Sequence, residues 1–142
     1  MNDTDFPVRI FHNPACGTSR NTLAMIRSAG HEPLIVEYLE VGWSHAQLRE
    51  LAARAGLSLR QLMREKGTPA EALGLLAADV GEDRILDAMV AHPILVNRPI
   101  VVTPKGVKLC RPSEVVFDLL DRKPESFTKE DGEVVRPGRD EA

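Results

Sequence analysis

The fold of this chain is decided by the stretch from Phe11 to Arg20, which reads FHNPACGTSR. A short apolar run, Val8–Phe11, precedes it and is typical of a strand. Apolar residues spaced three apart follow it and predict a helix over Gly17–Ala29, which Gly30 ends. Cys16 therefore lies in a strand-to-helix turn, with its sulfur near the start of the helix.

This position makes Cys16 a candidate nucleophile. The first backbone N–H groups of a helix have no partner within it, and they bind anions at an end that carries about +0.5 charge. A lowering of the thiol pKa by about two units, within the range known for helix starts, leaves most of the thiol ionised at pH 7. The alternative is that Cys16 is a small buried hydrophobe, as lone cysteines usually are. The predicted substrate-binding residues of the turn are Asn13, Gly17, Thr18 and Ser19.

Composition limits the classes to which the protein can belong. The 142 residues suit one domain, and the 43% apolar share is enough for a core. A net charge of −3 gives no general attraction for nucleic acid or membrane, and no apolar run approaches the about 20 residues that span a bilayer. Cys16 and Cys110 form no disulfide framework, and residues 1–5 lack the features of a signal peptide. The sequence therefore predicts a soluble cytoplasmic protein with no metal site.

The order of predicted elements indicates an α/β fold. A second strand at Leu34–Leu39 completes a βαβ unit, whose two strands are expected to be parallel. A helical block follows at about 44–92, and a strand at Ile100–Val102 and a hairpin partner at Val107–Cys110 lead to a final helix from Pro112. Four helices are predicted in the block, beginning near Ser44, Ser58, Thr68 and Glu82.

This order matches a thioredoxin-like mixed sheet with an all-helical insertion. Residues 1–122 are predicted to form the single domain, with a loose end at 1–6, and residues 123–142 a polar, weakly ordered tail. In that architecture a proline, usually after a cis bond, precedes the third strand and faces the cysteine turn. Pro99 stands in this place, so a cis Arg98–Pro99 bond is predicted.

The turn carries one thiol only. Thioredoxin-like redox proteins often have a second cysteine three residues after the first, where this chain has Ser19. Another thiol must therefore resolve Cys16 if it turns over as a redox group. The Ser19 hydroxyl either donates to the thiolate or caps the helix backbone, and both roles stay open. Cys110 is either an internal resolving thiol or a buried structural cysteine.

Arginines supply the cations of an oxyanion site. Arg98 precedes Pro99 and Arg111 follows the last strand, so both are expected at the strand ends nearest Cys16. Guanidinium groups bind tetrahedral oxyanions through paired hydrogen bonds and stay charged. Arg64 in the second inserted helix is a further candidate, with which neighbouring Arg60 competes.

Three runs of the chain carry a family resemblance. They span residues 12–23, 92–104 and 109–116, and the likeness extends from about Val8 to Val135, including the run FTKEDGE at 127–133. The chain resembles the glutaredoxin-dependent arsenate reductases. The resemblance implies Cys16 as the nucleophile and Arg64, rather than Arg60, as the third arginine. The catalytic residues implied by the resemblance are His12, Cys16, Arg64, Arg98 and Arg111.

The resemblance also implies a reaction. The Cys16 thiolate attacks arsenate, Arg98 and Arg111 hold the oxyanion, and Arg64 stabilises charge in the intermediate or product. Glutathione then reduces the cysteine-bound arsenic, and reduced glutaredoxin removes the glutathione, with no tightly bound cofactor. His12 is linked to thiolate reactivity in the family.

Two other functions remain open from the sequence. Regulators of this fold contact RNA polymerase, but they typically carry a two-cysteine switch that Ser19 denies here. A related small reductase of unknown substrate would share the Cys16 turn while differing in the arginines, so the presence of all three arginines weighs against it. Phosphate has the shape and charge of arsenate, but a thiol does not readily reduce it, so we expect at most inhibition.

Overall fold

The computed structural model describes residues 6–137. The chain forms two compact units, one of Met1–Glu37 with Arg98–Ala142 and the other of Tyr38–Asn97, named below the sheet unit and the helical unit. The loose end predicted at residues 1–6 lies outside the described residues except for Phe6. The last part of the predicted tail, residues 138–142, also lies outside them.

The sheet unit is built on four strands in the order β2-β1-β3-β4. β1 (Arg9–His12) pairs in parallel with β2 (Leu34–Glu37) and antiparallel with β3 (Ile100–Thr103). β3 and β4 (Gly106–Leu109) form an antiparallel pair joined by a tight turn. The prediction that the first two strands are parallel and the prediction that the last two form a hairpin are therefore both confirmed.

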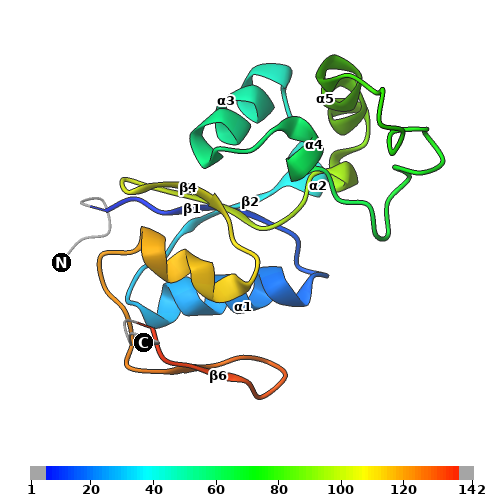
Figure 1. The fold of residues 1–142 in the computed structure, drawn as a ribbon. Coiled ribbons are helices and arrows are strands. Elements are labelled where there is room, and N and C mark those ends of the chain that lie inside the picture. The colour runs from blue at the N-terminus through cyan, green and yellow to red at the C-terminus, as the bar shows by residue number, and fades with distance from the viewer. Residues whose placement is uncertain (1–5, 138–142) are drawn as a thin grey trace. The chain divides into compact units, whose positions relative to one another are not determined.

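Two helices lie side by side on one face of this sheet (Figure 1). α1 (Gly17–Ser28) follows β1 and ends before Gly30, whose φ of +95° is left-handed, as the predicted glycine stop requires. η3 (Ser113–Leu119) follows β4 and is a 3-10 helix. No helix within residues 6–137 is long and apolar enough to cross a bilayer. The apolar core joins strands and helices through Val8, Ile10, Met25, Ile26, Val101, Cys110, Val116 and Phe117.

The second strand is shorter than its apolar pattern predicts. β2 ends at Glu37, and Tyr38–Val41 forms the short helix α2, so the prediction that the strand reaches Leu39 is wrong. The Tyr38 side chain is fully buried and stacks on Trp43, with ring centroids 5.1 Å apart. This packing stabilises a helical backbone at Tyr38, although the local sequence favours a strand.

The helical unit contains α3 (His45–Ala55), α4 (Leu59–Leu62), α5 (Glu82–Ala91) and η2 (Pro93–Leu95). The caps predicted from sequence are present: Ser44 accepts from the Gln47 N–H, and Ser58 forms a full capping box. α4 ends at Leu62 rather than near Gly67, because the next residue, Met63, has an extended backbone and forms a β-bridge with Val96.

The helix predicted from Thr68 is wrong. Only one helical turn forms after Pro69, with the Leu73 N–H bonded to the Pro69 carbonyl. Gly74 then adopts a φ of +75°, and the N–H groups of Gly74 and Leu75 bond back into that turn. This is a Schellman motif, which ends a helix, and it comes too early for the helix to extend.

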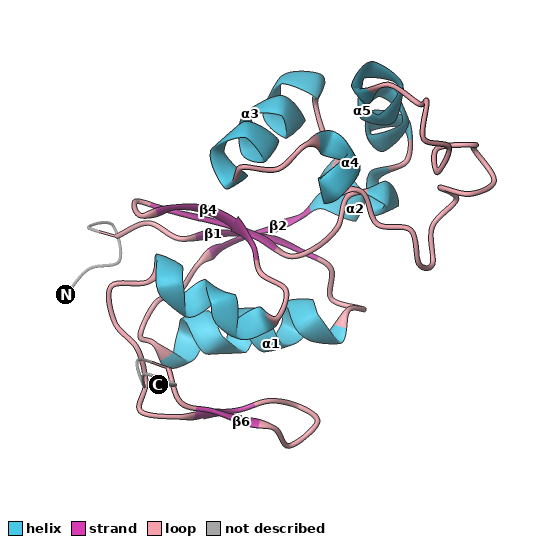
Figure 2. Ribbon diagram, viewed as in Figure 1, coloured by secondary structure: helices cyan, strands magenta, loops and turns pink. Residues whose placement is uncertain are grey.

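A second, two-stranded sheet follows η3. β5 (Phe127–Thr128) pairs with β6 (Val134–Val135), and this C-terminal hairpin lies on the side of α1 and η3 away from the main sheet (Figure 2). Gly132, with a φ of +94°, allows the tight turn between the two strands. These residues fall in the stretch predicted to be a weakly ordered tail, where the sequence pattern indicates no strand.

Candidate active site

Cys16 is the N-cap residue of α1, as the strand-to-helix pattern predicts. Its backbone is extended, with φ −100° and ψ 122°, and its N–H donates to the Asn13 carbonyl at 3.0 Å. The Asn13 side-chain oxygen accepts from the Ala15 N–H at 2.9 Å and closes the turn. Cys16 is a free, largely buried cysteine with 9% of the residue exposed, and the turn reaches solvent through the exposed Pro14 and Ala15 beside it.

The surroundings of Cys16 lower its pKa from 9.0 to about 7. Burial acts in the opposite direction and raises it. Hydrogen bonds to the thiolate from the Arg98 side chain, the Ser19 backbone N–H and the Arg111 side chain outweigh burial, and the charge of Arg98 adds to them. About half of the thiol is therefore ionised at pH 7, which makes Cys16 a competent nucleophile.

Arg98 and Arg111 flank the β3–β4 pair. Arg98 lies two residues before β3 and Arg111 two residues after β4, so the antiparallel pairing brings them to the same edge of the sheet. The Arg111 Nη1 lies 3.9 Å from the Cys16 Sγ and donates to the Arg98 carbonyl at 2.9 Å. The Arg98–Pro99 bond is cis, as predicted, and the Arg111–Pro112 bond is cis as well. One thiolate and two guanidinium groups thus meet within the sheet unit.

His12 and Ser19 form a buried pair beside the turn. The His12 Nδ1 lies 2.7 Å from the Ser19 hydroxyl, which also accepts from the Asn13 N–H at 3.1 Å. The hydroxyl therefore fixes the loop, while the backbone N–H of Ser19 bonds to the thiolate. Burial lowers the pKa of His12, the charge of Glu37 opposes this, and two arginines lower it further, so the surroundings favour the neutral imidazole.

The other predicted binding residues have backbone tasks in the turn. The Thr18 carbonyl accepts from the Thr22 hydroxyl at 2.8 Å. A Cβ on Gly17 would lie 3.6 Å from the Arg20 Nη2 and 3.8 Å from the Glu130 Oε1, so an ion pair lies directly over this glycine. Both distances are ordinary van der Waals contacts, so the pair lies above this position without requiring a glycine there.

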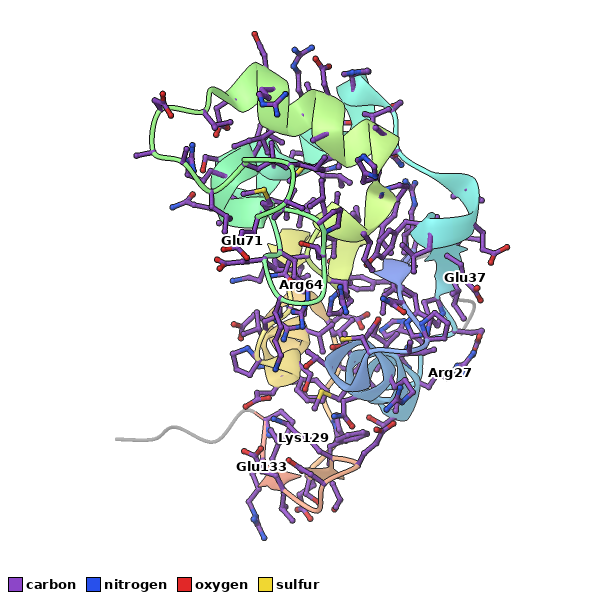
Figure 3. The ribbon with its side chains drawn as sticks, turned by 90° about the vertical axis from the view of Figure 1, so that its right-hand side faces the viewer. Arg27, Glu37, Arg64, Glu71, Lys129 and Glu133 are labelled. Atoms are coloured by element: carbon purple, nitrogen blue, oxygen red, sulfur yellow. The ribbon has the colours of Figure 1, made fainter. Side chains whose placement is uncertain are left out.

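Arg64 belongs to the helical unit, where Figure 3 labels it. It lies two residues beyond α4, and the prediction that it is part of that helix is wrong. Its N–H donates to the Leu95 carbonyl at 2.7 Å, and its Nη1 donates to the Asn97 side-chain oxygen at 3.3 Å. Arg60 is engaged with carbonyl groups of its own unit, at Ala77 and Val80. The role of Arg64 toward Cys16 stays a prediction.

Comparison with known proteins decides the family. The pattern of the ArsC family matches residues 11–119, which include Cys16, Arg64, Arg98 and Arg111. The chain belongs to the ArsC family. The resemblance to a family of arsenate reductases drawn from the sequence runs is therefore confirmed.

Relatives of this ArsC-family chain match it over nearly their whole length. An arsenate reductase of Rhizobium meliloti (strain 1021) is 60% identical over 129 residues, which cover 90% of this chain and 92% of that protein. An arsenate reductase of Escherichia coli (strain K12) is 54% identical over 129 residues, with the same two shares. The solved structure of an arsenate reductase from Vibrio cholerae superposes with a TM-score of 0.77 at 37% identity, covering 81% of this chain and 98% of that one. This likeness confirms the predicted thioredoxin-like α/β fold.

Cys110 has different surroundings from Cys16. It is fully buried in the apolar core of the sheet unit, and its thiol points toward the Lys108 carbonyl at 3.7 Å. Burial raises the pKa of Cys110 to about 12. Such a thiol stays protonated at neutral pH, and of the two roles left open for Cys110 its surroundings favour the structural one.

One group beside the ArsC-family turn is not predicted from the sequence. Arg20 donates to both carboxylate oxygens of Glu130 and to the Pro14 carbonyl. The two side chains are 110 positions apart in the chain, so no local pattern relates them. The only signal was that both Arg20 and Glu130 fall in runs that carry the family resemblance.

The side chains of the described residues show what chemistry the site can perform. Within residues 6–137, no group of three or more His, Cys, Asp or Glu side chains could hold a metal ion. The reactive groups are a partly ionised thiol, two guanidinium groups and the amides at the start of α1. Such a set can hold a tetrahedral oxyanion and attack its central atom.

Proposed function

We propose that this ArsC-family chain reduces arsenate to arsenite through a covalent adduct on Cys16 that glutathione and glutaredoxin resolve. The coarser statement, that the chain is an arsenate reductase, rests on the ArsC match and on 60% identity to a curated arsenate reductase over 90% of the chain. The observation that carries the finer proposal is the Cys16 thiolate, with its pKa near 7, hydrogen-bonded by Arg98 and Arg111.

The first step joins sulfur to arsenic. The Cys16 thiolate attacks As(V), an S–As bond forms, and one As–O bond breaks as its oxygen leaves, taking up protons to become water. Arg98 and Arg111 bind the remaining oxygens and neutralise their charge, and the amide of Ser19 holds the sulfur in line. Two cations within reach of one sulfur match a multiply charged substrate better than a neutral one.

The second step transfers two electrons. Glutathione attacks the arsenic of the adduct and displaces a second oxygen as water, so that arsenic is bonded to both the Cys16 sulfur and the glutathione sulfur. The thiolate of reduced glutaredoxin then attacks the glutathione sulfur; the As–S bond to glutathione breaks with its electron pair left on arsenic, which becomes As(III), and the two thiols leave as one glutaredoxin–glutathione disulfide. Water then displaces the Cys16 sulfur from As(III), which releases arsenite and returns Cys16 as a thiol. An external thiol is required because Ser19 stands three residues after Cys16, and because Cys110 is fully buried with its pKa raised to about 12.

Two residues and a location complete the proposal. Arg64 stabilises charge in the intermediate or product, and His12 supports the thiolate by fixing Ser19 at 2.7 Å. The reaction takes place in the cytoplasm, where glutathione keeps thiols such as Cys16 and Cys110 reduced.

The test is arsenate-dependent NADPH oxidation with glutathione, glutaredoxin and glutathione reductase supplied. We expect turnover that needs arsenate and glutaredoxin together, that disappears in Cys16→Ser, and that phosphate inhibits without being consumed. Turnover with arsenate and glutathione alone would contradict the glutaredoxin step and leave the reductase activity standing. If the wild-type protein shows no arsenate dependence at all, the regulator that binds RNA polymerase becomes the better hypothesis.

A further inference from the structure

The starts of two helices carry the reactive groups of the sheet unit. Cys16 caps α1, and Arg111 lies two residues before η3. The Arg111 Nη1 lies 3.9 Å from the Cys16 Sγ, so their contact depends on how the first turns of these two helices are held. The apolar core joins the two helices through residues further along each of them, such as Met25 and Val116.

The C-terminal hairpin contacts the first turn of both helices. On the α1 side, Glu130 accepts two hydrogen bonds from Arg20, at 2.9 and 3.0 Å, and its N–H donates to the Asn21 side chain at 3.0 Å. On the η3 side, the Lys129 Nζ lies 2.7 Å from the Glu114 Oε1. Neighbouring residues of one turn thus bind α1 and η3 at the same time.

Arg20 extends this connection into the cysteine turn itself. Its Nη1 donates to the Pro14 carbonyl at 2.9 Å, two residues before Cys16. The Arg20–Glu130 pair also lies over Gly17, directly after Cys16. The hairpin therefore reaches the residues on both sides of the nucleophile through one guanidinium group, whose fork geometry fixes direction as well as distance.

The turn of the hairpin is built to hold these side chains. The Lys129 N–H donates to the Glu133 carbonyl at 2.8 Å, and the Gly132 N–H donates to the Lys129 carbonyl at 2.9 Å. The Lys129 Nζ also lies 3.1 Å from the Glu133 Oε1, and Figure 3 labels both residues on the hairpin. The Lys129 side chain is only 10% exposed, so its ammonium group is paired with Glu114 and Glu133 rather than hydrated by solvent.

We propose that Glu130 and Lys129 of the C-terminal hairpin are positioning residues, which hold Cys16 and Arg111 at their working separation through Arg20 and Glu114. This inference rests on the proposed function, because it concerns the site where the oxyanion would bind. The hairpin makes no chemical step of its own. It sets how well the donors to the thiolate, and then to the substrate oxygens, stay aligned.

For Glu130→Gln, the change in charge alone and the loss of positioning predict opposite results. Glu130→Gln removes a negative charge near an anion site, which by electrostatics lowers the pKa of Cys16 and strengthens arsenate binding. If the hairpin positions the site, the same change weakens the fork to Arg20, raises the pKa of Cys16 and reduces kcat/KM. Lys129→Met removes a positive charge, and under the proposal its effects have the same sign as those of Glu130→Gln.

The experiment measures two quantities in the full chain. One is the pH midpoint of Cys16 alkylation by iodoacetamide, located by peptide mass mapping, which needs no arsenate and so stands even if the proposed function fails. The other is kcat and KM for arsenate in the coupled assay. For Glu130→Gln and for Lys129→Met we expect the midpoint to rise by about half a unit. We expect kcat/KM to fall about tenfold, less than the hundredfold that a 1 Å misplacement can cost.

A matched control lies at the other end of α1. Arg27 binds Glu32 with the same forked geometry, at 3.1 and 2.9 Å, and with similar exposure. Glu32→Gln should leave both quantities unchanged, and thermal unfolding of all three variants shows whether any effect is merely loss of fold. An unchanged or lower midpoint in Glu130→Gln, together with unchanged or higher kcat/KM, overturns the proposal. A loss confined to the unfolding temperature, with both site quantities unchanged, overturns it as well.

Discussion

The two cysteines of this chain lie in the same unit and have opposite chemistry. Cys16 caps a helix, keeps 9% of its surface exposed and receives hydrogen bonds from two arginines and one amide, which bring its pKa to about 7. Cys110 lies on no helix start, is fully buried among apolar side chains, and has its pKa raised to about 12. Reactivity here is a property of the surroundings rather than of the residue type, so changing either set of surroundings should change the chemistry.

The largest expected effect separates the two thiols. Cys16→Ser should abolish arsenate reduction, because a serine hydroxyl has no accessible anion at neutral pH to attack arsenic. Cys110→Ser should keep most of the turnover. The measurement is arsenate-dependent NADPH oxidation for both variants at a temperature where both are folded. Equal loss of activity in the two variants would show that Cys110 is a resolving thiol after all.

The next effect concerns the donors that distinguish Cys16. Arg111→Ala should reduce kcat/KM for arsenate by about a hundredfold, the usual cost of removing one donor from an oxyanion site. It should also raise the pKa of Cys16, since a hydrogen bond to the thiolate is lost. Arg49→Ala is the control, because Arg49 is an exposed residue of α3 that pairs with Asp83. Equal kinetics in these two variants would remove Arg111 from the site.

A smaller effect should appear in the stability of the two cysteine variants. Here Cys110→Ser, rather than Cys16→Ser, should be the more damaging change. Cys110→Ser places a hydroxyl in the apolar core and should lower the free energy of unfolding by about 1 to 3 kcal/mol. Cys16→Ser should change it by less, because the turn is polar and reaches solvent. Urea unfolding of the two variants measures both values. A more stable Cys110→Ser than Cys16→Ser would contradict the structural role given to Cys110.

The sequence predicts the Cys16 half of this comparison well, because local patterns determine it. A strand, a turn rich in small residues and a helix ended by Gly30 place the thiol at a helix start without any tertiary information. The meeting of Arg98 and Arg111 also follows from pattern, since both flank one antiparallel pair. The Thr68 helix fails because Gly74 ends it after one turn, a competition that the start signal alone does not reveal.

Contacts between distant side chains are what the sequence does not predict. Arg20 and Glu130 are 110 positions apart, and nothing local indicates that a polar tail folds back as a hairpin onto α1. The task of the Ser19 hydroxyl stays open from sequence for the same reason. Its partner His12 lies on β1, and only packed side chains decide between the thiolate, the helix backbone and that imidazole.

The central claim is that Cys16 is held as a thiolate near neutral pH, and its pH titration tests this most directly. The folded pKa lies below the ordinary value of 9.0, so the thiolate should form as pH rises through about 7. The ultraviolet absorbance of the thiolate, followed against pH in the wild type and in Cys16→Ser, measures this midpoint. The account predicts a step near pH 7 that is present in the wild type and missing in Cys16→Ser. A step at pH 9 or above, or one that survives in Cys16→Ser, would contradict it.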